Sequence, residues 1–284
     1  MYDCFLTAYQ AFQAAEVEDP LLETLHLMDL LSNGAFRRLD WGFLSRARVN
    51  LGHVVQERRT GKPLEYTLGR STFMGLTLYS SPAALIPRKE TELLVETVLD
   101  AVRYREKAGA PVKVIDVGTG SGNIAVSLAV YSQHTELLAT DISQDAVELA
   151  ARNVCRFGLR ERVSLFCGDL LQPLTGKGYE GEIDVVVCNP PYIPTLSLGK
   201  LRSEIIDHEP RVALDAGAYG IDLLRRLVCE AAPFLKPGGM LAFEIGTGQE
   251  RVARWLVQSS ELYQDVRLVA GDAGDIRVIC ATRK

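Results

Sequence analysis

The sequence lacks the features of a disulfide-rich, metal-binding or membrane-spanning protein. Its six cysteines are spread over 284 residues without a Cys-x-x-Cys pair, and its four histidines never fall at metal-ligand spacing. We therefore expect neither a disulfide framework nor a bound metal. No apolar run approaches the ~20 residues of a membrane helix, and residues 1–10 contain no Lys or Arg, unlike a secretory signal. These absences predict a cytoplasmic protein with no membrane partner.

The chain also has fewer basic than acidic residues. The chain has 31 Lys and Arg against 36 Asp and Glu, a formal net charge of −5. A protein that holds long nucleic acid neutralises phosphates with basic residues, so DNA is not an expected partner. Hydrophobic residues make up 47% of the chain and charged residues 24%, which is ordinary for a globular protein. At ~150 residues per domain, the length suggests about two domains.

The charge is distributed unevenly over residues 1–72. Residues 1–36 contain six acidic residues and no Lys or Arg, whereas residues 37–72 contain three acidic residues and eight basic ones. The basic ones are Arg37, Arg38, Arg46, Arg48, Arg58, Arg59, Lys62 and Arg70. Apolar spacing here is helical, with start and stop signals at Asp19-Pro20 and Gly61-Lys62-Pro63. We expect a small helical bundle whose basic half is either a solvated face or a docking surface for a substrate protein.

Residues 73–87 alternate and break like a short hairpin linker, and residues 88–284 then switch between strand and helix periodicity. The expected strands are 112–117, 137–140, 163–166, 183–188, 240–244, 266–269 and 277–281. The expected helices are 90–107, 123–131, 144–157, 221–235 and 250–258. This alternation predicts an α/β fold with a parallel sheet that binds its ligands at the carboxyl ends of the strands.

A glycine-rich turn follows the first of these strands. Its residues are Gly118, Thr119, Gly120, Ser121 and Gly122. Glycines let the backbone pass close to a ligand, and the amides of the next helix face it. The spacing G-x-G-x-G differs from the dinucleotide fingerprint G-x-G-x-x-G, which argues against a nicotinamide cofactor.

Acidic residues follow the next two strands. Asp141 lies nineteen residues beyond Gly122, where a carboxylate can accept the hydroxyl protons of a ribose; the alternative is a helix cap, and the two roles are compatible. Asp169 and Leu170 come after the third strand, where an adenine edge would lie. For Asp169 a helix cap and an adenine contact are equally open.

The fourth strand ends in Asn189-Pro190-Pro191-Tyr192. Its prolines remove amide donors and leave a rigid cluster of acceptors. The Asn189 side-chain oxygen and the Pro190 carbonyl could hold both N–H bonds of a planar NH₂ group while the Tyr192 ring packs on its face. The alternative is an ordinary proline-rich loop after a strand.

Together, the glycine turn, Asp141 and the Asn-Pro-Pro-Tyr turn resemble Rossmann-like S-adenosylmethionine-dependent methyltransferases that modify a planar amide or amine nitrogen. Between about residues 63 and 281 the likeness is narrower, to the HemK/PrmC-type release factor glutamine methyltransferases. The segments that resemble that family are Leu85-Ile86-Pro87-Arg88 with Thr91-Glu92, the stretch from Glu209 to Leu214, and Glu244-Ile245-Gly246 with Gln249.

The resemblance implies a mostly parallel, seven-stranded class I methyltransferase sheet at 88–284 and an N-terminal bundle at 1–72 that helps to hold the release factor. It also implies S-adenosyl-L-methionine as cofactor, S-adenosyl-L-homocysteine as product, no metal, and methylation of the N5 nitrogen of the glutamine in the Gly-Gly-Gln motif of release factors. The implied catalytic residues are Asn189, Pro190 and Tyr192, and these with Pro191 bind substrate. The implied cofactor residues are Gly118, Thr119, Gly120, Ser121, Gly122, Asp141, Asp169, Leu170 and Asn189. Leu170 replaces a Trp that the family often has, which removes ring stacking on adenine.

Two alternatives stay open on the sequence alone. Adenine-N6 nucleic-acid methyltransferases use a similar Asn-Pro-Pro-Tyr turn, but this chain lacks a basic groove and a large target-recognition insert. The segment from Glu209 to Leu214 discriminates between the two enzyme classes. The other alternative is a non-catalytic protein that binds a translation factor and retains a relic cofactor site.

Overall fold

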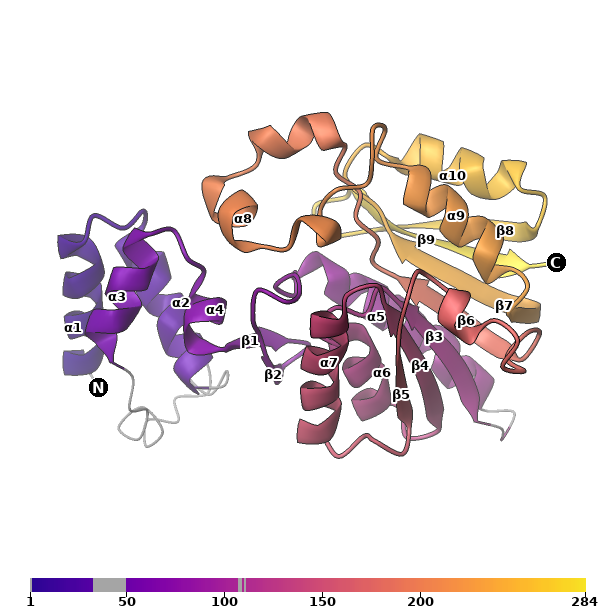
Figure 1. The fold of residues 1–284 in the computed structure, drawn as a ribbon, viewed down its shortest axis with the longest axis horizontal. Helices are drawn as coiled ribbons and strands as arrows, with labels where there is room; N and C mark the ends of the chain where they lie inside the picture. The colour runs from indigo at the N-terminus through magenta and orange to yellow at the C-terminus, as the bar shows by residue number, and fades with distance from the viewer. Residues whose placement is uncertain (1, 33–49, 107–108, 110) are drawn as a thin grey trace.

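A computed structural model describes the whole chain except residues 1, 33–49, 107–108 and 110 (Figure 1). The described residues of the N-terminal part form the helices α1 (Tyr2–Ala14), α2 (Pro20–Ser32), α3 (Leu51–Arg59) and α4 (Leu64–Leu68). Their apolar faces share one core of Ala8, Phe12, Leu27, Met28, Leu30, Leu31, Val54 and Leu64. The helical character expected here is confirmed for the described residues. The expected helix start near residue 45 lies outside them.

Two side-chain caps explain where these helices begin. The Asp19 carboxylate accepts a hydrogen bond from the Leu22 amide at 3.1 Å, and Pro20 is the first helical residue. Asn50 likewise accepts from the His53 amide at 3.2 Å and caps α3. The Asp-Pro start signal in the sequence therefore works as expected.

A hairpin of β1 (Arg70–Phe73) and β2 (Leu76–Tyr79) follows the helices. Met74 and Gly75, at φ of 50° and 72°, form its two-residue turn. The hairpin thus begins three residues before the expected start at Phe73 and ends well before residue 87. The apolar alternation does not mark the start of the hairpin, because Ser71 is buried like the apolar Phe73 and burial here does not follow hydrophobicity.

Seven strands then form one sheet in the order β5-β4-β3-β6-β7-β9-β8. The strands are β3 (Val112–Val117), β4 (Thr135–Asp141), β5 (Val163–Cys167), β6 (Ile183–Cys188), β7 (Leu235–Glu244), β8 (Tyr263–Ala270) and β9 (Ile276–Arg283). Neighbours from β5 to β7 are parallel, and β9 runs antiparallel to both β7 and β8. The predicted fold class, a mostly parallel seven-stranded sheet, is confirmed.

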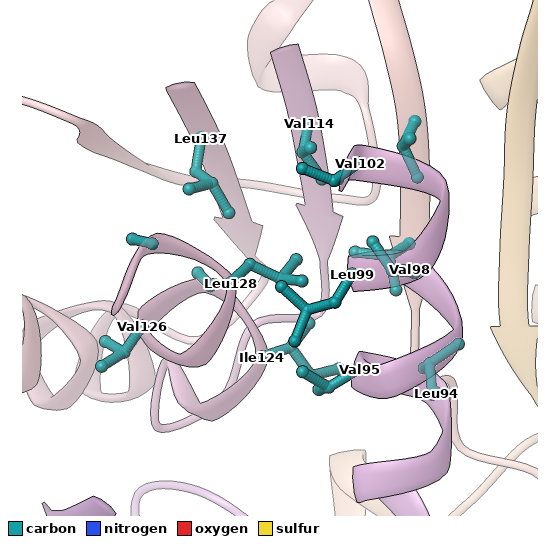
Figure 2. Packing of buried hydrophobic residues seen from close by; sticks show 14 of the residues in the cluster. Leu94, Val95, Val98, Leu99, Val102, Val114, Ile124, Val126, Leu128 and Leu137 are labelled. Atoms are coloured by element: carbon teal, nitrogen blue, oxygen red, sulfur yellow. The ribbon is translucent and has the colours of Figure 1, made fainter. Parts of the chain in front are cut away.

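Helices cover both faces of this sheet (Figure 1). One face packs α5 (Glu90–Glu106), α6 (Asn123–Tyr131) and α7 (Gln144–Arg156), and the other packs α9 (Asp222–Ala231) and α10 (Glu250–Ser259). Short 3₁₀ turns at 172–174, 195–200 and 211–213 and the short helix α8 (Ser203–His208) lie in the loops. Figure 2 shows Val95 and Leu99 of α5 pointing toward Ile124 and Leu128 of α6. Five of the six residues of β3 are buried, and four of the six are apolar, as expected for a strand covered on both faces.

The helix expected at 221–235 is shorter than predicted, because Leu235 already belongs to β7. That strand opens at Leu235, whose Cα pairs with that of Ile183, and its register shifts before Met240. Leu235 is buried in the same cluster as Leu227 and Val228 of α9, so apolar spacing alone did not separate the helix from the strand. The short helix α8 was not expected at all.

The site-forming edge of the sheet lies at a switch point beside β3. The chain proceeds from β3 to β4 and β5 on one side and then crosses to β6 on the other. Val117 pairs with Thr140 of β4 and with Cys188 of β6. The residues that follow these strand ends, Gly118 and Asn189, together with Asp141, are therefore brought to one edge.

Candidate active site

A cavity of about 350 Å³ opens at this edge, within the range of ~300–1,000 Å³ usual for small-molecule sites. The sequence-predicted residues that line it are Gly118, Thr119, Gly120, Ser121, Asp141, Asp169, Leu170, Asn189, Pro190, Pro191 and Tyr192. Gly122 is absent from the wall. Residues of the loop from Ala83 to Arg88, Thr91 of α5 and residues of the segment from Pro210 to Asp215 also line the cavity.

The glycine turn has three residues in the left-handed region: Gly118, Gly120 and Gly122, at φ of 70°, 55° and 79°. A Cβ on Gly122 would lie 3.2 Å from the Cβ of Ala150 in α7. Gly122 therefore allows α6 to approach α7 and does not line the cavity. The Gly120 amide donates to Asp141 Oδ2 at 2.8 Å, so this amide is already paired within the protein.

Asp141 ties two strand ends together. Besides Gly120, its carboxylate accepts from the Ser143 amide, which lies 2.9 Å from Oδ1. The cap of α7 is Ser143, whose hydroxyl oxygen accepts from the Ala146 amide. Burial raises the pKa of Asp141, opposed by its backbone hydrogen bonds. Each carboxylate oxygen can accept more than one hydrogen bond, so Asp141 can also accept from a ribose.

Asp116, in the middle of the sheet, was not singled out from the sequence. Its fully buried Oδ2 accepts from the Thr119 hydroxyl at 2.6 Å and from the Ala125 amide at 3.2 Å, while Oδ1 has no partner among the described residues. Burial raises the pKa of Asp116 to about 7. The available signal was a carboxylate inside an apolar strand directly before the glycine turn, since such a group needs a reason to be buried.

After β5, the structure excludes one of the two roles expected for Asp169, that of a helix cap. Asp169 does not cap a helix, because its carboxylate pairs with Arg226 of α9 at 2.9 Å. Leu170 has a φ of 46° and is 8% exposed, and it contributes to the cavity wall. A branched side chain in this backbone region is unusual and marks a constrained turn. An adenine contact by either residue stays a prediction.

The Asn-Pro-Pro-Tyr turn follows β6, the strand next to the one that leads into the glycine turn, and is held by buried polar groups. Asn189 Nδ2 donates to Thr91 Oγ1 at 3.0 Å, and the Thr91 hydroxyl donates to Glu244 Oε2 at 2.7 Å. Arg277 lies 3.3 Å from Glu244 Oε1. Thr91 and Glu244 belong to segments that resemble the family but had no assigned role, and nothing in the sequence pointed to Arg277.

Tyr192 is fixed by the segment after β7. Gln249 Nε2 donates to the Tyr192 carbonyl at 2.9 Å, and a Cβ on Gly246 would lie 3.0 Å from the Tyr192 ring. Burial raises the pKa of Tyr192. The ring is therefore held tightly at the cavity wall, and Gly246 leaves the space for it.

The segment from Glu209 to Leu214 closes the cavity from outside the sheet. The Ile193 amide donates to the Leu214 carbonyl at 3.2 Å, and the Ala216 amide donates to the Ile193 carbonyl at 2.9 Å. Arg88 forms an ion pair with Glu209, which joins this segment to the loop before α5. The motif that resembles the family thus has a structural position directly beside the Asn-Pro-Pro-Tyr turn.

Arg58, counted among the candidate docking residues, is used inside the protein. Its guanidinium lies 2.7 Å from Glu23 of α2 and 3.0 Å from Glu204 of α8, and its side chain is 8% exposed. The prediction that Arg58 is a docking residue is thus wrong. Arg59 is exposed, whereas Arg37 and Arg38 lie outside the described residues.

In the part of the chain that the structure describes, no helix is long and apolar enough to cross a bilayer. No group of three or more His, Cys, Asp or Glu side chains in the same residues is arranged to hold a metal ion.

The fold and site define a methyltransferase. Residues 89–218 match the family model described as Methyltransferase small domain. Two solved structures share the fold. The N-terminal domain of human METTL16 in complex with SAH has a TM-score of 0.56 and 17% identity, over 80% of this chain and 82% of that one. The hMettl16 catalytic domain with an RNA hairpin has a TM-score of 0.57 and 12% identity, over 83% of this chain and 93% of that one.

Curated relatives narrow the class. A release factor glutamine methyltransferase of Moorella thermoacetica is 38% identical over 98% of this chain and 96% of its own length. Another, of Nitratidesulfovibrio vulgaris, is 34% identical over 97% and 92%, and one of Geobacter sulfurreducens is 43% identical over 69% and 65%. The chain belongs to the release factor glutamine methyltransferase family.

Proposed function

We propose that this protein transfers a methyl group from S-adenosyl-L-methionine to the N5 nitrogen of the glutamine in the Gly-Gly-Gln motif of peptide chain release factors. The observation that best supports this is the Asn189 amide at the cavity wall. Its Nδ2 is committed to Thr91, and its Oδ1 has no hydrogen-bond partner among the described residues. That oxygen is an acceptor ready for a substrate N–H.

The cavity fits the cofactor by its donor set and shape. The glycine turn brings backbone close to the cavity, the Asp141 carboxylate suits ribose hydroxyls, and Leu170 with Ile142 offers apolar surface for adenine. Gly118, Thr119, Gly120 and Ser121 would lie along the methionine end. When bound, S-adenosyl-L-methionine supplies an electrophilic methyl group that leaves its sulfur as the bond to the glutamine nitrogen forms.

The residues of the Asn-Pro-Pro-Tyr turn orient the nucleophile. An amide nitrogen is almost non-basic, so its lone pair must be aimed at the methyl carbon without prior loss of a proton. Asn189 Oδ1 and the Pro190 carbonyl accept its two N–H bonds, Pro191 keeps the turn rigid, and the Tyr192 ring packs on the amide face. The proton leaves during or after transfer. Proximity and orientation then supply much of the rate.

The helices of residues 1–72 form the part that helps to hold the release factor, residues 73–87 link it to the catalytic part, and residues 88–284 perform the transfer. The reaction belongs to translation, so the place of work is the cytoplasm. The negative net charge supports a protein substrate over DNA.

The direct test uses the purified protein, a purified release factor and methyl-labelled cofactor, with the label mapped by peptide mass. We expect one methyl group on the glutamine of the Gly-Gly-Gln motif and none on DNA or RNA oligonucleotides. Label on nucleic acid would instead support an adenine-N6 methyltransferase. Cofactor binding without any transfer would support a non-catalytic translation-factor binding protein.

The first prediction concerns Asn189→Ala, measured by single-turnover transfer at saturating cofactor. Loss of one preorganised acceptor should lower the rate roughly 10²-fold or more, with little change in cofactor affinity. Tyr192→Phe is the matched comparison and should be mild, because its ring and not its hydroxyl faces the substrate. Near-normal transfer by Asn189→Ala would refute this role.

A further inference from the structure

We propose that Thr91 and Glu244 are positioning residues that lock the Asn189 amide with its oxygen facing the substrate. The inference rests on the proposed function, in which Asn189 Oδ1 accepts a substrate N–H. Neither residue needs to touch the reacting atoms, because each acts through Asn189.

The three side chains meet because of strand register. Cys188, the last residue of β6, pairs with Phe243 of β7, so the following residues, Asn189 and Glu244, are neighbours across the two strands. Thr91 enters from the first turn of α5 and bridges them. Thr91 is 1% exposed and Glu244 is fully buried, so water does not compete for these hydrogen bonds.

Donor and acceptor chemistry then permits only one orientation of the amide. A threonine hydroxyl has a single proton, and an ionised carboxylate can only accept. Thr91 must therefore donate to Glu244, which leaves its oxygen as an acceptor toward Asn189. Only the NH₂ end of Asn189 can satisfy it, so the amide oxygen points away from Thr91 and is free for the substrate.

The other oxygen of Glu244 faces groups that favour its ionised form. Arg277 Nη2 lies 3.3 Å from Oε1, and the Tyr192 hydroxyl lies 3.5 Å from the same atom. Burial raises the pKa of Glu244, as does nearby Glu90, while Arg277 and the Thr91 hydrogen bond oppose the shift. The Arg277–Glu244 ion pair thus sets the donor direction of the two hydrogen bonds that follow, from Thr91 to Glu244 and from Asn189 to Thr91.

The oxygen and NH₂ ends of the Asn189 amide are nearly isosteric, so without these hydrogen bonds the amide could adopt either orientation. A rotated Asn189 would present Nδ2 to the substrate NH₂, donor against donor, and would lose the acceptor that orients the nucleophile. The expected loss resembles removal of the acceptor itself and affects the transfer step more than binding.

Four variants separate these effects. Thr91→Val keeps the shape of the side chain and removes its hydroxyl, whereas Thr91→Ser keeps the hydroxyl and removes the methyl group. Glu244→Gln inverts the chain: Arg277 and Tyr192 favour its amide oxygen, so its NH₂ faces Thr91, and the Thr91 hydroxyl then donates to Asn189. Thr97→Val is the control, since among the described residues this hydroxyl on the same helix bonds only the Leu93 carbonyl.

In single-turnover transfer with release factor, we expect Thr91→Val and Glu244→Gln to be slower by roughly 10²-fold. KM for the release factor and Kd for S-adenosyl-L-homocysteine should change less than about threefold. Thr91→Ser and Thr97→Val should remain near the unmodified protein. A near-normal rate in Thr91→Val, or an equal loss in Thr91→Ser, would overturn the proposal, as would a change in KM or Kd that accounts for the whole effect.

A second readout needs no turnover. In the ligand-free protein, the side-chain NH₂ protons of Asn189, assigned by their loss in Asn189→Ala, should be protected from solvent exchange and remain so in Thr91→Ser. They should lose that protection in Glu244→Gln, which reports the flip even if Thr91→Val fails to fold. Unchanged protection in Glu244→Gln would refute the lock. If the unmodified protein methylates no release factor but the protection follows this pattern, the proposed function fails and the positioning of Asn189 stands.

Discussion

At the scale of single residues, the candidate site depends on a carboxylate that holds two backbone groups. Asp141 accepts from the Gly120 and Ser143 amides through different oxygens, and so couples the glycine turn to the start of α7. A residue of this kind shapes the binding site before any cofactor enters. Substitutions there therefore test the geometry of the turn and the ribose contact together.

The second prediction concerns Asp141→Ala and Asp141→Asn. Both should weaken S-adenosyl-L-homocysteine binding, since a lost hydrogen bond to a charged group costs ~1.5–3 kcal/mol. Asparagine should be nearly as harmful as alanine, because its NH₂ would face one of the two backbone N–H donors. Calorimetric titration checks this, with exposed Asp145→Asn as the control. Unchanged affinity in Asp141→Ala would remove Asp141 from the cofactor site.

At the scale of elements, the regular βα units were predictable because strand and helix periods differ and because glycine and proline mark their ends. Val112–Val117, Asn123–Tyr131 and Ile183–Cys188 have the expected bounds. The position of the candidate site residues at these strand ends was predictable for the same reason, whereas their roles stay predictions. What failed was the helix at 221–235, which runs into a strand of equally apolar residues, and α8, which is too short to show a period.

The polar groups behind the site were less predictable, because their pairing is purely tertiary. Thr91 bonds Glu244 across 153 positions of the chain, and Arg277 reaches Glu244 from the last strand. Single-sequence spacing contains no information about such pairs. Arg58 shows the same limit in reverse: its charge suggested a surface role, whereas the fold uses it to join α2, α3 and α8.

The third prediction tests that connection between elements. Arg58→Ala leaves Glu23 and Glu204 without their shared cation and frees the Lys62 carbonyl, which accepts from Arg58 at 2.9 Å. Removing one partner of a buried ion pair typically costs ~3–5 kcal/mol. We expect a loss of about 3 kcal/mol in the free energy of unfolding, measured by urea denaturation. Exposed Arg59→Ala is the adjacent control and should change it by less than about 0.5 kcal/mol. Equal effects of the two variants would contradict the role of Arg58 in joining α2, α3 and α8.

At the scale of the whole molecule, the charge asymmetry of residues 1–72 is the remaining clue to how a protein substrate docks. The fourth prediction is that Arg37→Glu, Arg38→Glu and Arg59→Glu together raise the KM for intact release factor, most strongly at low salt. Cofactor affinity should not change, and a short Gly-Gly-Gln peptide should show an unaltered KM. An unchanged KM for intact release factor at low salt would make these arginines a solvated face.

Whole-molecule stability should also depend on pH through Asp116, because this buried carboxyl lies in the central strand between the two main cores. Burial raises its pKa from 3.8 to about 7 in the folded protein. Below pH 3.8 both states hold the proton, and between 3.8 and about 7 only the folded state holds it. The free energy of unfolding must therefore fall as pH rises through this window and level off above it.

The fifth prediction is the size of that fall. A shift from 3.8 to about 7 corresponds to ~4 kcal/mol, since one pKa unit is ~1.4 kcal/mol. Asp116→Asn removes the ionisation while its side-chain oxygen can still accept from Thr119 and Ala125. The difference in unfolding free energy between the unmodified protein and Asp116→Asn should thus shrink or reverse from pH 4.5 to pH 8, by about 3–4 kcal/mol. Urea denaturation of both proteins across this range measures it. Parallel pH profiles would show that Asp116 is already ionised in the folded protein at low pH, because its hydrogen bonds then outweigh its burial.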